Sequence, residues 1–139
     1  MSAETRCSFE KALISGLAEC TQAQRLEIGE RLVCLCHSPA AAKLCSRYLS
    51  LLRKNTRFLF RQTDAQNSIL SNYQEIQLQC GGLQGLVEVV HGEQVDKKFD
   101  VSALLNRVED EYKDIEDIRL DRIVPRIAGY NPRPHRKKR

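Results

Sequence analysis

Three of the six cysteines lie close to a histidine in the segment RLVCLCHSPAAAKLC, residues 31–45. Thiolate and imidazole groups are the usual ligands of zinc, and a thiolate beside a histidine can act as a nucleophile. We interpret Cys34, Cys36 and His37 as part of a helix, in which side chains two positions apart point in nearly opposite directions. Zinc sites also separate paired cysteines by about two to four residues, whereas one residue separates this pair. We therefore expect no metal site, and we interpret Cys45 and the others as small buried side chains.

No catalytic motif accompanies these cysteines. The histidines are His37, His91 and His135, and their positions do not indicate a base beside a nucleophile. The patterns of a phosphate-binding loop, a zinc protease and a serine hydrolase are all missing from the sequence. We therefore predict a protein that is not an enzyme, that needs no cofactor, and that works by binding partners.

Basic residues form a second distinctive group, because residues 31–63 contain no acidic residue. Five of the basic residues follow one another at steps of four, seven, three and four, so a continuous helix would present them as one stripe. We call this stripe the basic ridge; its members are Lys43, Arg47, Lys54, Arg57 and Arg61. Such a ridge can bind the phosphates of RNA or DNA, or an acidic protein surface.

Two features of the sequence point away from nucleic acid. Residues 108–121 carry seven acidic side chains on a predicted helix, and these could pair with the ridge inside the fold. Phe58 and Phe60 would stack on bases only if they were exposed, and such residues are more often buried. We therefore expect a protein partner first and direct binding of RNA or DNA as the alternative.

The C-terminal residues 126–139 contain two prolines, one glycine and no acidic residue. Their basic residues are Arg126, Arg133, Arg136, Lys137, Lys138 and Arg139. The net charge of the whole chain is +4, so residues 1–125 carry a net charge of −2. We predict a flexible basic tail over 126–139 that serves nuclear import or contacts an acidic or phosphate-bearing partner.

Helical spacing dominates the rest of the chain, which predicts an all-α, compact bundle of about five to six helices over residues 1–125. We expect helices over residues 8–20, 21–37, 39–54, 64–80, 83–92 and 100–125. Thr21 and Gln24 form a capping-box pattern, and Ser38 with Pro39 suits the start of the next helix. The sequence CGG at 80–82 indicates a helix end, and Pro125 ends the last helix.

One segment has two readings. Residues 75–90 alternate polar and apolar, and a turn at Gly81 and Gly82 would pair Cys80 with Leu83 in a β-hairpin. This alternative makes the fold α+β, whereas the helical stripe from Ile69 favours two helices.

The composition is that of one folded domain, with 42% hydrophobic and 29% charged residues in 139. No apolar run reaches the length of a membrane span, and charges interrupt the first 20 residues, so we expect neither a membrane segment nor a secretory signal. We predict a subunit or adaptor of a nuclear or ribonucleoprotein assembly that binds other protein subunits, with the cytoplasm as the alternative location. The sequence leaves the oligomeric state open.

Overall fold

A computed structural model describes residues 5–60, 70–92 and 98–131. Within these ranges the chain forms both helices and strands, so the fold is α+β and the expected all-α bundle is wrong. The elements in chain order are β1 (Thr5–Arg6), α1 (Glu10–Ser15), β2 (Ala18–Glu19), β3 (Ala23–Ile28), β4 (Arg31–Cys36), α2 (Pro39–Asn55), α3 (Asn72–His91), β5 (Phe99–Asp100), α4 (Val101–Tyr112), the 3-10 helix η1 (Ile115–Asp117) and α5 (Leu120–Gly129).

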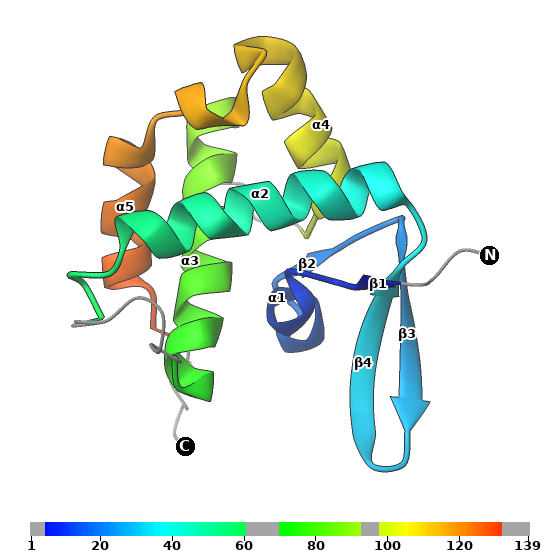
Figure 1. Cartoon of the computed structure of the whole chain (residues 1–139). Coiled ribbons are helices and arrows are strands. Elements are labelled where there is room, and N and C mark those ends of the chain that lie inside the picture. The colour runs from blue at the N-terminus through cyan, green and yellow to red at the C-terminus, as the bar shows by residue number, and fades with distance from the viewer. Residues whose placement is uncertain (1–4, 61–69, 93–97, 132–139) are drawn as a thin grey trace.

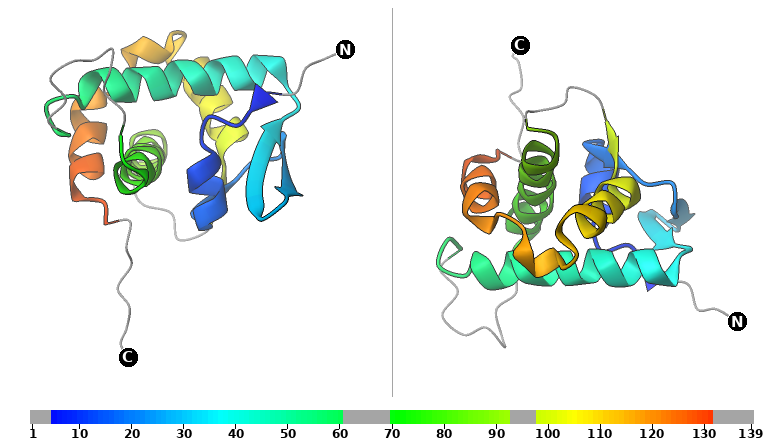
Figure 2. Two further views of the ribbon diagram at one scale, coloured as in Figure 1. Left: turned by 60° about the horizontal axis from the view of Figure 1, so that its bottom comes forward. Right: turned by 90° about the horizontal axis from the view of Figure 1, so that it is seen from above.

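Helix α2 lies across α5, α3 and α4, as Figure 1 shows from the front and Figure 2 shows from above. The helix was predicted to within one residue, because the Ser38 hydroxyl accepts the amide of Ala41 at 3.1 Å and Pro39 occupies the first turn. Its inner face is apolar, and Tyr48 is fully buried there. The Tyr48 ring stacks on Phe9, with 5.9 Å between ring centroids. This packing fixes α2 with its polar face outward.

Residues 23–36 form a β-hairpin instead of the helix predicted over 21–37. Strands β3 and β4 pair antiparallel from Ala23 opposite Cys36 to Ile28 opposite Arg31. The two residues between the strands begin with Gly29, whose φ of +64° suits the first position of a tight hairpin turn. The prediction failed because the apolar residues of this segment fit a helical stripe as well as the alternation of a strand.

Two further short strand pairs occur in the described residues, and only the first of them includes a strand of the hairpin. Strand β1 pairs antiparallel with the end of β4, and β2 pairs parallel with β5. The predicted helix over 8–20 is therefore shorter, since α1 ends where Gly16 adopts a φ of +90°. The free end of the β3–β4 hairpin projects beyond the helices (Figure 1).

Helix α3 is one continuous helix, so CGG does not end a helix and no hairpin forms at 75–90. The glycines serve close packing. A Cβ atom at Gly81 would lie 2.6 Å from the Cα of Ile127, and one at Gly85 would lie 3.0 Å from the Cα of Ile123. Both contacts are with α5, which can approach α3 closely only because these positions lack side chains. Residues 64–69 of the predicted helix lie outside the described residues, and Ser71 caps α3.

The predicted last helix over 100–125 is three shorter elements. The first of these, α4, starts as expected after Asp100, whose carboxylate accepts a hydrogen bond from the amide of Ala103 at 2.8 Å. It ends before Lys113, which has a φ of +66°. Pro125 lies inside α5 and does not end it. Residues 126–129, predicted as tail, complete that helix, and Ile127 is fully buried.

No helix in the described ranges combines the length and the apolar composition needed to cross a membrane.

Candidate functional site

The exposed face of α2 carries the ridge residues that lie in this helix. Lys43, Arg47 and Lys54 are exposed and follow one another at steps of four and seven, so they share one face. The exposed hydroxyls of Ser46 and Ser50 lie between them. From Lys43 to Lys54 the helix rises about 16 Å. The structure therefore brings these three predicted residues together on one surface.

Two arginines of α2 are engaged in ion pairs with other elements. Arg47 contacts Asp114 at 3.2 Å, and both side chains are about half exposed, so this pair contributes little stability. Arg53 binds Glu75 of α3 through two hydrogen bonds of 2.9 and 2.7 Å. The Glu75 side chain is only 13% exposed, so Arg53 is held more firmly than Arg47. The predicted pairing of the ridge with the acidic segment is thus realised at Arg47.

The other ridge cations among the described residues face solvent. Within the described ranges, Lys43, Lys54 and Arg57 form no ion pair. Phe58 follows directly and is 74% exposed, whereas Phe60 is partly buried against the core. The surface at the end of α2 therefore combines free positive charge with an exposed aromatic ring.

Arg61 and the tail residues of the prediction lie outside the described residues. These tail residues are Arg133, Arg136, Lys137, Lys138 and Arg139. Arg126, in contrast, belongs to α5, and its guanidinium lies 3.2 Å from the Glu88 carboxylate of α3. Arg126, the first basic residue of the predicted tail, therefore belongs to the folded part of the chain.

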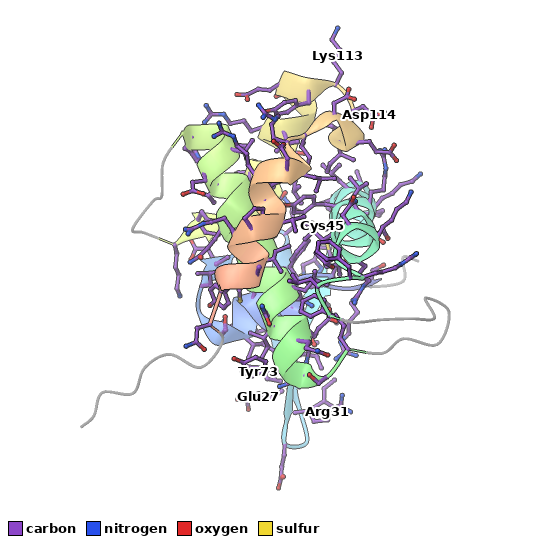
Figure 3. The ribbon with its side chains drawn as sticks, turned by 90° about the vertical axis from the view of Figure 1, so that its left-hand side faces the viewer. Glu27, Arg31, Cys45, Tyr73, Lys113 and Asp114 are labelled. Carbon is purple, nitrogen blue, oxygen red and sulfur yellow. The ribbon has the colours of Figure 1, made fainter. Side chains whose placement is uncertain are left out.

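A shallow groove of about 240 Å³ separates α2 from η1. Arg47 and Lys54 line it from α2, and Ile115 and Glu116 line it from η1. Asp114 precedes Glu116 and is labelled with its neighbour Lys113 in Figure 3. The ridge therefore has an acidic flank, and a phosphate backbone that approached the ridge would meet these carboxylates.

Acidic residues dominate the surface beyond this groove. In residues 108–121 the exposed acidic side chains are Glu109, Asp110, Glu111, Asp114, Glu116, Asp117 and Asp121. Arg107 and Glu111 pair with each other at 3.1 Å along α4, and Arg119 pairs with Asp121 at 3.0 Å. Asp114 pairs with Arg47, so within the described ranges the side chains that form no ion pair are Glu109, Asp110, Glu116 and Asp117. The exposed surface next to α2 is therefore mixed in charge.

Two of the cysteines lie in a strand and not in the predicted helix. Cys34 and Cys36 lie in β4, where residues two apart point to the same side of the strand, so the helical argument against a shared ligand was wrong. His37 does not end a helix either; it follows β4, and its Nε2 lies 2.9 Å from Oε1 of Gln24. Within the described ranges no group of three or more histidine, cysteine or acidic side chains is arranged to hold a metal ion.

The thiols are free and mostly buried, as we expected of small core side chains. Burial raises the pKa of Cys7 to about 12, and burial also raises the pKa of Cys45, which lies on the buried face of α2. The pKa values of Cys20, Cys34 and Cys80 are raised by the same cause. Since the thiolate is the reactive form, these five groups stay protonated and unreactive at neutral pH.

A polar network below α2 was not predicted. Gln79 is buried in α3, and its Oε1 accepts the amides of Lys11 and Ala12 at 3.0 and 3.3 Å. It thereby caps the first turn of α1, where no local side chain does so. The Gln79 amide donates to Glu75 at 2.8 Å, and Glu75 holds Arg53. The partners lie on three helices, so local sequence spacing gives no signal for this network.

The chain matches no protein-family model, no curated protein and no solved structure.

Proposed function

We propose that this chain is a non-enzymatic protein–protein interaction module, an adaptor or subunit of a larger assembly, whose docking surface is the exposed face of α2. The observation that carries the proposal is the solvent-facing pair Lys43 and Lys54, which forms no ion pair within the described ranges and has no acidic neighbour on its own helix. Acidic side chains of a protein partner would bind these lysines, and the partner's basic side chains would meet the acidic flank at Glu116.

The mixed charge of the surface favours a protein partner over nucleic acid. A phosphate backbone carries one sign of charge, so it gains at Lys43 and Lys54 and loses at Asp114 and Glu116. A protein surface can carry both signs in the matching arrangement. The tail residues 132–139 would then serve nuclear import, which makes the nucleus the proposed location and the cytoplasm the alternative.

The test is capture of partners from nuclear extract with the full chain, in the presence and absence of nuclease. The informative variant combines Lys43→Glu with Lys54→Glu. Its matched control combines Lys98→Glu with Arg122→Glu, which changes the charge equally at exposed positions away from α2. A chain that ends at Asn131 tests the tail and leaves α5 complete.

We expect the same proteins to bind the wild type, the control and the shortened chain after nuclease treatment, and to be lost from the α2 variant. Retention of those proteins by the α2 variant would show that α2 is not the docking surface. Loss of all partners upon nuclease treatment would show that nucleic acid, not protein, is the ligand.

Direct binding of single-stranded RNA or DNA is the second candidate, and the exposed ring of Phe58 beside Arg57 favours it. An aromatic ring next to a cation is the usual platform for an unstacked base. If this candidate is right, the dissociation constant for a single-stranded oligonucleotide rises steeply with salt concentration, and Phe58→Ala weakens binding about tenfold. Fluorescence anisotropy with a labelled oligonucleotide measures both effects.

A further inference from the structure

Strand β3 forms the outer edge of the three-stranded sheet, whose order within the described ranges is β1, β4, β3. The amide of His37 donates to the carbonyl oxygen of Gln22 at 2.8 Å. In an antiparallel ladder the residues that bond to the partner strand alternate with residues that point away from it. Counting from Gln22 in the observed register, Leu26 points its backbone groups at β4, and Arg25 and Glu27 point theirs away. In Figure 1 this outer side of β3 faces away from the helices.

The charged side chains of β3 lie on one face of the sheet. Arg25 lies opposite the buried Cys34, and its guanidinium donates to the carbonyl oxygen of Leu13, so this face looks toward α1. Glu27 shares that face, is exposed, and has no partner within the described ranges. Figure 3 shows Glu27 on the part of the hairpin that extends beyond the helices.

The opposite face of the hairpin is largely apolar. It carries Leu26, Ile28, Val33 and Leu35, with Gln24 and Arg31 on the same face, and none of the four apolar side chains belongs to the main core cluster. Ile28 is 59% exposed. The hairpin thus offers an open edge of backbone groups together with an apolar strip that is most exposed at Ile28.

We propose that β3 pairs antiparallel with β3 of a second copy of this chain and so joins two sheets across a two-fold axis. Edge pairing supplies main-chain hydrogen bonds, and a two-fold axis uses the same residues from both copies. This inference is independent of the function proposed for α2, since it rests on the hairpin alone.

Charge selects one register of this pairing. Only Arg25 and Glu27 present free amides outward, so three registers are possible. The first places Arg25 opposite Arg25, and the second places Glu27 opposite Glu27. In the third, Arg25 of each copy lies opposite Glu27 of the other copy. The first two registers place like charges directly opposite each other, which is unfavourable. The third register forms two ion pairs, four main-chain hydrogen bonds and a contact between the two Leu26 side chains. Charged side chains usually protect an edge strand from pairing, but in this register they attract.

The small size of this edge limits the affinity of the dimer. Only five residues, Gln24–Ile28, pair with their copy, which is an interface below the usual size of a stable complex. We expect a reversible dimer with a dissociation constant of about 10–100 µM. In the dimer the two apolar strips become continuous across the axis.

The experiment uses the full chain and two single variants, Arg25→Glu and Glu27→Arg, in sedimentation equilibrium between about 5 and 500 µM. Each variant opposes like charges in the chosen register, so each alone should dimerise at least about tenfold more weakly than the wild type. A mixture of the two variants places glutamate opposite arginine at both positions. We therefore expect the mixture to recover the wild-type dissociation constant.

Recovery on mixing also shows that both variants are folded, and circular dichroism checks each one separately. Asp110→Arg on the exposed face of α4 is the matched control for the charge change, and it should dimerise as the wild type does. A monomeric wild type up to about 500 µM would overturn the proposal. So would unchanged dimerisation of both variants, or folded variants that stay monomeric when mixed.

Discussion

The contact between α3 and α5 makes Gly81→Ala the most informative single change in this fold. Alanine is the better helix former by about 1 kcal/mol, so helix propensity alone predicts stabilisation. The structure predicts the opposite, because the added Cβ would lie 2.6 Å from the Cα of Ile127 and 3.2 Å from the carbonyl oxygen of Arg126. These atoms belong to backbone and cannot turn away, so α5 must move as a whole.

Overpacking of a core costs about 1–3 kcal/mol, and more where backbone must shift. We therefore expect Gly81→Ala to lower the free energy of unfolding by about 1–2 kcal/mol after the gain in helix propensity. Gly82→Ala meets the side chain of Leu52 at a shorter separation, but that side chain can rotate, so we expect a smaller loss than at Gly81. Gly129→Ala meets nothing within 4 Å and serves as the control.

Urea unfolding followed by circular dichroism gives these free energies. The expected order of stability is Gly129→Ala above Gly82→Ala above Gly81→Ala. A Gly81→Ala protein as stable as the wild type would refute the close approach of α5 to α3.

Three further outcomes follow from the polar groups and the thiols. Gln79→Leu leaves the amide of Lys11 without its acceptor and should cost about 1–3 kcal/mol in urea unfolding; no loss would mean that this amide finds another partner. Burial is the largest influence on Glu10 and opposes its ionisation, but the hydrogen bonds from Arg6 and from the amide of Cys34, together with the positive charges of Arg6 and Lys11, lower the pKa of Glu10 overall. The resulting stability is present above the unfolded pKa of about 4.3 and is lost as pH falls through the lower folded pKa. The Glu10→Gln protein should therefore lose less stability on acidification, and an unchanged pH profile would contradict this. Cys7, with a pKa raised to about 12, should react with iodoacetamide much more slowly in the native than in the unfolded protein, as mass spectrometry of the labelled peptides measures.

Where local signals agreed, the sequence predicted the structure. Helix α2 was predicted because Ser38 and Pro39 mark its start and apolar residues repeat along one face. The same spacing predicted that Lys43, Arg47 and Lys54 share a surface, which the structure confirms.

The errors arose where long-range packing overrode a local signal. Glycines usually end helices, but Gly81 and Gly85 continue α3 because α5 packs directly against them. The hairpin was missed because a helical stripe and a strand alternation fit residues 21–35 equally well, and only the Gly29 turn distinguishes them. Local spacing likewise gives no indication that Glu75 holds Arg53, since the two residues lie on different helices.

The central claim is that a protein partner binds the exposed face of α2, and chemical crosslinking tests it most directly. A reagent that joins lysine amines to carboxylates, applied to the complex captured from nuclease-treated extract, reports which lysines lie beside acidic residues of the partner. We predict links from the partner's aspartate or glutamate residues to Lys43 and Lys54, and none to the exposed Lys98. Links confined to Lys98 or to other lysines outside α2 would contradict the claim and place the partner elsewhere on the molecule.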